Sequence, residues 1–265
     1  MNAMVTSTKK NTTVPSAAKI YWLETRNEFL RMLRTPMFAI PTLLFPLVFY
    51  VMFGVLLNRG NSNAGIYMMA TYGVFGVMGA SMFGFGVTVA MERSQGLLRL
   101  KRALPVPPGA YVFAKTGMAM VFVLMITLCM MLVATVLAKV TLTPTQALLL
   151  ILINLLGSLP FAALGLYIGT LSSANGSPAI LNMVMLPMAF LSGLWLPLSI
   201  LPQWLQNIAP IWPSYHLSQL ALKVVGQGAG QSSWLHVGVL VAVTLVFAVL
   251  ARGRLARAEY IPTAG

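Results

Sequence analysis

One serine and one late histidine of this 265-residue chain have the types that a hydrolytic pair would need. Ser192 and His236 are candidates for the nucleophile and base of an intramembrane serine protease, which must meet within hydrogen-bonding distance. The Ser lacks the preceding Gly of a Gly-x-Ser-Gly turn, because position 190 is Phe, and His236 lies at the outer start of an apolar run. We therefore predict no catalytic residue and keep the protease as the third of three interpretations.

The sequence has no recognisable motif for binding a nucleotide or a metal ion. The run GQGAGQSS, residues 226–233, lacks the Lys that a phosphate-binding loop requires. The single cysteine, Cys129, excludes a disulfide framework and a cysteine-based zinc site. We predict that this chain binds no metal and no cofactor, so any nucleotide chemistry belongs to another chain.

The charged segment MERSQGLLRLKRALPVPPGAYVFAK, residues 91–115, holds five of the 17 Lys and Arg between two apolar runs. Residues 92–104 can form about three helical turns, with Leu97, Leu100 and Leu104 in one stripe. Pro105 ends that helix. The pattern predicts a short helix that projects from the membrane and can be pushed by a partner.

The composition predicts a polytopic membrane protein. Hydrophobic residues make up 58% and charged residues 8% of the chain, and the mean hydropathy is +0.84. Since a helix needs about 20 apolar residues to cross the hydrocarbon core, we predict six spans in an all-α fold: residues 37–57, 66–90, 110–138, 147–171, 179–196 and 235–251. The net charge of +13 does not indicate nucleic-acid binding, because the basic residues lie in short segments between apolar runs.

The distribution of basic residues orients the spans. Lys and Arg concentrate before span one, in the 91–115 loop and after span six, which places both termini and this loop in the cytoplasm. Only Lys115 and Lys139, at the ends of span three, are charged residues within the spans. Proton- and ion-coupled carriers retain such charges in their spans, so the energy for any pumping must come from a partner.

An amphipathic helix is predicted at residues 20–35, after a flexible cytoplasmic tail of residues 1–19. Trp22 and Phe29 fall on its apolar face, and Glu24, Glu28 and Arg31 fall on its polar face. Such a helix lies in the membrane interface. Its two acidic residues leave two interpretations open, a lipid anchor alone or an anchor that also docks a protein.

Small residues recur at steps of four in span two, at Gly76, Ala80 and Gly84. Such a stripe allows helices to approach closely in lipid, either within one bundle or at a dimer seam or pathway. After span five, prolines break the chain into pieces too short to span, which predicts re-entrant helices. The tryptophans there fit an interfacial aromatic belt or a hydrophobic gate.

Two motifs resemble the ABC-2 type transporter permeases. The first runs from Glu92-Arg93-x-x-Gly96 to Leu104-Pro105-Val106, with Lys115 leading into the next span. The second is LSGLWLPLSILPQWLQNIAPIWPSYHLSQLAL, residues 191–222. The resemblance covers nearly all of the chain after about residue 20 and implies a transmembrane domain over residues 36–258.

The resemblance implies a membrane subunit of a bacterial exporter in the cytoplasmic (inner) membrane, a homodimer with two separate ATPase subunits that bind ATP and Mg²⁺. It implies that the loop between spans two and three is a coupling helix: Glu92, Arg93, Gly96, Leu97, Leu100, Leu104 and Pro105. It implies an outer gate of re-entrant helices: Leu191, Ser192, Gly193, Pro197, Leu201, Pro202 and Trp204. The substrate of such an exporter would be a lipophilic drug or a lipid-linked or polysaccharide molecule. The alternative is a passive channel or a scaffold subunit.

Overall fold

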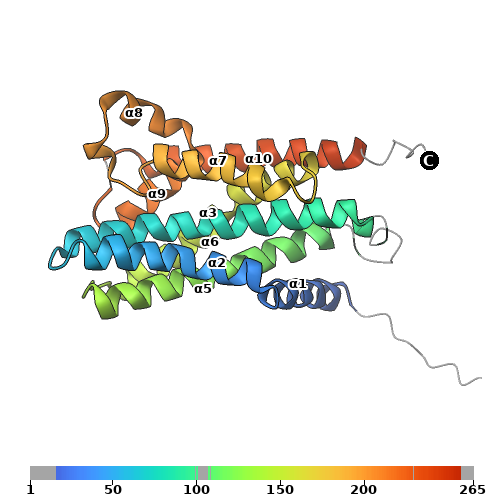
Figure 1. Cartoon of the computed structure of the whole chain (residues 1–265), viewed down its shortest axis with the longest axis horizontal. Helices are drawn as coiled ribbons and strands as arrows, with labels where there is room; N and C mark the ends of the chain where they lie inside the picture. The colour runs from blue at the N-terminus through green and yellow to red at the C-terminus, as the bar shows by residue number, and fades with distance from the viewer. Residues whose placement is uncertain (1–15, 99, 101–106, 108, 229, 258–265) are drawn as a thin grey trace, which may run out of the picture.

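The structure, a computed structural model, describes residues 16–98, 100, 107, 109–228 and 230–257, and over these residues all regular structure is helical (Figure 1). The long helices are α1 (Ala17–Leu33), α2 (Pro36–Phe49) with the π-helical turn η1 (Tyr50–Leu56), α3 (Ser62–Ser94), α5 (Ala110–Leu137), α6 (Pro144–Leu171) and α10 (Ser233–Arg257). The all-α prediction is confirmed for the described part of the chain.

Five helical segments in this part of the chain are long and apolar enough to cross a membrane: α2 with η1, α3, α5, α6 and α10. They correspond to the first, second, third, fourth and sixth predicted spans. The predicted fifth span, residues 179–196, is shorter than expected, because α7 (Ser177–Leu191) ends five residues earlier. Gly193 follows in the left-handed backbone conformation, φ +79°, which stops the helix.

Short helices follow α7 and form a cap at one end of the bundle (Figure 1). They are η2 (Leu198–Ile200), α8 (Gln203–Ile208), η3 (Ala209–Ile211) and α9 (Pro213–Val224). Pro202 and Pro213 stand just before or at the start of α8 and α9, where a missing N–H costs no helical hydrogen bond. The first described turns of α1 and the last turns of α3 and α10 lie at the opposite end of the bundle from this cap.

The central helix of the bundle is α3, and most of its residues are buried. It packs closely on α6 because two glycines of α6 meet its backbone. A Cβ on Gly165 would lie 2.5 Å from the carbonyl oxygen of Met82, and one on Gly169 would lie 2.6 Å from that of Gly86. The spacing Gly-x-x-x-Gly is typical of helices in close contact within lipid, and our sequence analysis did not use it.

The small-residue stripe of α3 also packs within the chain. A Cβ on Gly76 would lie 2.7 Å from Cγ2 of Ile126 in α5, and one on Gly84 would lie 3.4 Å from Cε of Met118. Ala80 is fully buried. These contacts favour the first of the two interpretations of the stripe, packing within one bundle.

The predicted start of a separate helix at Glu92 is wrong. Glu92 lies in the last turn of α3, which continues to Ser94, and the chain breaks at Gly96, whose φ is +71°. A left-handed glycine after a helix is a usual C-terminal stop. Leu97 and Leu100 follow in helical backbone, whereas Leu104 and Pro105 lie outside the described residues.

Candidate functional site

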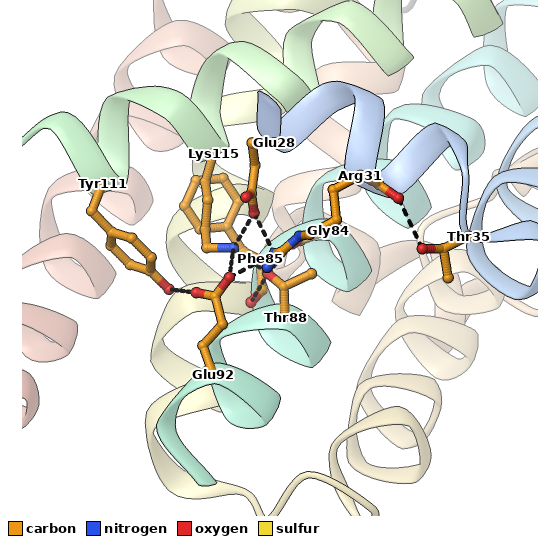
Figure 2. A network of polar contacts seen from close by, with 9 residues as sticks. All are labelled: Glu28, Arg31, Thr35, Gly84, Phe85, Thr88, Glu92, Tyr111 and Lys115. Carbon is orange, nitrogen blue, oxygen red and sulfur yellow. Dashed lines mark hydrogen bonds and ion pairs between the residues drawn. The ribbon is translucent and has the colours of Figure 1, made fainter. Parts of the chain in front are cut away.

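Four charged side chains from three helices meet near the cytoplasmic end predicted for the bundle. Figure 2 shows Glu28 and Arg31 of α1, Glu92 of α3 and Lys115 of α5 pointing toward one another. We call this group the ionic junction. Glu28, Glu92 and Lys115 are 6%, 2% and 0% exposed, so these charges are removed from solvent.

Lys115 is the centre of the ionic junction. Its Nζ donates to Glu28 Oε1 at 2.5 Å and to Thr88 Oγ1 at 2.7 Å, and it lies 3.3 Å from Glu92 Oε1. Three acceptors satisfy the three N–H bonds of an ammonium group. A buried lysine can remain charged in such an environment because each proton has a partner.

Arg31 joins the two carboxylates from the outer side of the ionic junction. Its Nη2 lies 2.7 Å from Glu28 Oε1 and 2.6 Å from Glu92 Oε1. Burial alone would lower the pKa of Arg31, but the carboxylates of Glu28 and Glu92 outweigh that effect and raise the pKa above its ordinary value. Two carboxylates and two cations therefore balance, and the ionic junction carries no formal net charge.

The phenol of Tyr111 completes the coordination of Glu92. Its hydroxyl donates to Glu92 Oε2 at 2.7 Å, so both oxygens of this carboxylate are bonded. Buried ion pairs gain stability only when such additional hydrogen bonds satisfy the remaining lone pairs. The ionic junction thus fixes α1 and α5 against the final turn of α3.

Arg93, the neighbour of Glu92, attaches the end of α3 to α6. Its guanidinium donates to the carbonyl oxygen of Thr170, and Nη2 donates to that of Ser172 at 2.7 Å. These carbonyls lie at the C-terminus of α6, where helical acceptors lack partners and the helix dipole favours a cation. Glu92 and Arg93 therefore bond within the chain, at the base of the charged loop.

The polar face of α1 is divided between the protein and its surroundings. Glu28 is buried in the ionic junction, whereas Glu24 is half-buried. Of the predicted apolar face, Phe29 packs on Phe122 of α5, while Trp22 is 66% exposed. Glu28, one of the two acidic residues that suggested a docked protein, thus contacts this chain's own Lys115.

The sequence analysis placed Lys115 at the end of the charged loop but did not connect it with Thr88 or Tyr111. A signal was available, since the chain has only four acidic residues and two of them, Glu28 and Glu92, are in the ionic junction. A lysine within an apolar helix requires an acidic partner. Which acid it meets could not be predicted from the chain alone, because Glu28 is 87 residues away.

The predicted gate residues lie in and beside the cap. Ser192 is buried, and Pro197, Leu201 and Pro202 border the short helices η2 and α8. Tyr67 and Tyr72 of α3 donate to the carbonyl oxygens of Gly193 and Trp195 at 3.4 and 3.3 Å, so this segment is fixed to the central helix. Leu191 ends α7, and Trp204 is 62% exposed.

The structure does not assemble the Ser192/His236 pair. Ser192 Oγ donates to the carbonyl oxygen of Ala189 at 3.4 Å, and His236 pairs with His216. Over the described residues, no group of three or more His, Cys, Asp or Glu could hold a metal ion. The described contacts therefore do not form the proposed hydrolytic pair.

An apolar cavity of about 500 Å³ opens between α2, α3 and α7. Four phenylalanines line it, Phe38, Phe45, Phe75 and Phe83, together with the amide side chain of Asn182. None of its lining residues is charged. Apolar walls with few polar groups are typical of sites for small lipophilic molecules.

Comparison with known proteins identifies the family. The sequence profile described as "ABC-2 type transporter" matches residues 20–225. The chain belongs to the ABC-2 type transporter family. The match extends from the amphipathic helix α1 through the bundle to the end of α9, so the ionic junction lies wholly within the family domain.

A curated relative agrees with this assignment. The "Putative transport permease YvfS" of Bacillus subtilis (strain 168) is 30% identical over 230 residues, which cover 85% of this chain and 92% of the relative. The ABC-2 family consists of membrane permeases, and this permease is a multi-pass membrane protein with several apolar helices.

Proposed function

We propose that this permease is the membrane subunit of an ATP-driven exporter and works as a homodimer with two separate ATPase subunits in a bacterial cytoplasmic membrane. Membership of the ABC-2 family is the observation that carries the proposal. The chain has no phosphate-binding loop in its sequence, so hydrolysis of ATP takes place on the partner. The alternatives are a passive channel and a scaffold subunit.

The position of the ionic junction supports a mechanical role for the charged loop. Residues Leu97 and Leu100 follow the end of α3 directly, and Glu92 and Arg93 attach that end to α1, α5 and α6. A displacement of the loop by an ATPase would therefore move several helices together rather than bend one. In this mechanism of alternating access, the movement opens a path toward the gate segment 191–215.

A lipophilic substrate fits the apolar cavity between α2, α3 and α7. Its phenylalanines offer dispersion and ring contacts, while Thr42 and Asn182 supply polar groups. Desolvation of a charged substrate would be costly in a cavity lined without a charge. We therefore propose a neutral or weakly polar lipophilic molecule as the cargo.

Reconstitution tests this function. The permease and its ATPase are placed in vesicles with a neutral lipophilic dye, and dye movement is followed with ATP and Mg²⁺, with ADP, and with a non-hydrolysable ATP analogue. We expect movement with ATP only, and at least a several-fold slower rate in Phe83→Ala. Movement that is equal under all three conditions would indicate a channel and contradict the proposal.

A further inference from the structure

The only two histidines of the chain meet in the cap. His216 of α9 and His236 of α10 are 3% and 0% exposed, and their Nδ1 atoms lie 2.9 Å apart. At this distance one nitrogen must donate a proton and the other must accept it. We call these two residues the histidine pair.

A backbone carbonyl determines where the protons of the histidine pair lie. His216 Nε2 is 2.8 Å from the carbonyl oxygen of Pro210, and because a carbonyl only accepts, Nε2 of neutral His216 carries the proton. Nδ1 of His216 is then an acceptor, and Nδ1 of His236 donates to it. The free lone pair of the neutral histidine pair is therefore on Nε2 of His236.

That nitrogen is buried and has no hydrogen-bond partner in the described structure. Such an orphaned acceptor is rare in a folded protein and calls for an explanation. A proton added there would leave the Nδ1–H···Nδ1 bond intact. A second proton would instead have to go to Nδ1 of His216, so two N–H groups would face each other across 2.9 Å.

We propose that the histidine pair is a proton-binding site that accepts one proton while α9 is docked on α10, and that a second proton separates the two helices. Lys223 is the charged side chain that acts on His236, and it opposes every added proton. Its Nζ donates to the carbonyl oxygen of Gln231 and lies 3.2 Å from Ser233 Oγ. Tyr215 is the titratable group in ring contact with both histidines.

Within the described part of the chain, the other elements packed on α9 and α10 bring no compensating charge to the histidine pair. α6 contains no Asp, Glu, Lys or Arg; the charged residues of α3 are at its other end, in and beside the ionic junction; and Arg252 and Arg254 lie far along α10. Burial lowers the pKa of His216 from its ordinary value of 6.5, partly offset by the Pro210 carbonyl. Protonation of His216, the second step, therefore favours the undocked state, and docking is lost progressively as the pH falls below the ordinary value of 6.5.

Separation of α9 from α10 would open an apolar space. A cavity of about 370 Å³ lies between α6, α9 and α10, and its lining includes Leu217 and Val237, the residues that follow His216 and His236. The histidine pair thus joins α9 to α10 directly beside this cavity. The inference is independent of the ATPase and of the cargo, since it concerns contacts within one chain.

Exchange at the imidazole C2 position, followed by mass spectrometry from pH 4.5 to 8.5, measures the titration of each histidine. The full-length permease is purified with a tag that contains no histidine, so both signals belong to the histidine pair. We expect two protonation steps more than about one pH unit apart, with amide exchange over Pro213–Val224 rising at the second step. Simultaneous titration of both histidines near their ordinary value would overturn the proposal.

A matched variant separates the proton site from simple packing. In His236→Asn the amide Nδ2 can still donate to His216 Nδ1, but the orphaned nitrogen is gone. We expect its α9 amide exchange, corrected for intrinsic rates, to show less than half of the wild-type change between pH 7.5 and 5. An unchanged pH profile would contradict the proposal, and the wild-type titration remains decisive if this variant does not fold.

Discussion

At the scale of single residues, the balance of charge in the ionic junction decides its energetics. Lys115 and Glu92 are each satisfied by partners from two other helices. A buried ion pair adds little over apolar packing, but loss of one partner leaves an uncompensated charge and costs about 3–5 kcal/mol. Single and double substitutions should therefore behave very differently.

Glu28→Gln should destabilise the permease by about 3 kcal/mol, because Lys115 and Arg31 then lose one of their two carboxylates. The measurement is the free energy of unfolding in detergent. Glu24→Gln is the matched control, since it makes the same change four residues earlier on α1 at a half-buried position. It should change stability by less than about 0.5 kcal/mol.

The double variant Glu28→Gln/Lys115→Met completes a double-mutant cycle for the Glu28–Lys115 pair. Because it removes one negative and one positive charge together, it should recover at least half of the loss seen for Glu28→Gln. Purely additive losses would show that Glu28 and Lys115 do not interact across the 2.5 Å contact.

At the scale of elements, the contact between α3 and α6 depends on glycine. The backbone of α3 is the closest neighbour of Gly165 and Gly169, and backbone atoms cannot move aside as a flexible side chain can. The attachment of Arg93 to the end of α6 holds the same two helices together at the loop end. The two contacts hold α3 against α6 both within the bundle and at the loop end.

Gly165→Ala should destabilise the permease by about 1–3 kcal/mol, because its Cβ would overlap the Met82 carbonyl. Gly238→Ala is the control, as no atom lies within 4 Å of its added Cβ on the exposed side of α10. It should be neutral or stabilising, since Ala favours a helix over Gly. Thermal unfolding of both variants in the same detergent makes the comparison, and equal losses would contradict this account of α3–α6 packing.

The sequence predicted the long helices well and the short ones poorly. The predicted spans at 110–138 and 147–171 were close to α5 and α6. Long apolar runs form helices in lipid, because a helix satisfies its own backbone hydrogen bonds there. The end of α7 depended on the left-handed backbone of Gly193, and the continuation of α3 through Glu92 depended on tertiary contacts. Hydropathy treats Glu92 as the start of a loop, whereas in the fold its charge is paired with Lys115.

At the scale of the whole molecule, we propose that the charged loop and the ionic junction transmit movement of the ATPase to the helices of the bundle. Gly96 is the pivot between α3 and the segment that holds Leu97 and Leu100, and its φ of +71° is in the left-handed region. Among the described residues, no atom lies within 4 Å of a Cβ added at Gly96, so a substitution there acts on them through backbone strain. This position can be altered without disturbing the packed core.

Gly96→Val should uncouple the exporter, so that ATP hydrolysis continues while transport falls by about tenfold or more, because a β-branched residue rejects the left-handed conformation. Gly96→Asn is the matched control, since Asn tolerates that conformation, and it should retain most of the transport. The measurement is the number of dye molecules moved per ATP hydrolysed in reconstituted vesicles. Equal coupling ratios for the two variants would contradict the role of Gly96 as a pivot.

The central claim is that this permease works with a separate ATPase, and co-purification from native membranes tests it most directly. The permease is purified in mild detergent, and the co-eluting chains are identified and quantified by mass spectrometry. We predict an ATPase with a phosphate-binding loop at one copy per permease, and a loss of ATP-driven transport when it is removed. A permease that elutes alone and moves its cargo without ATP would contradict the account.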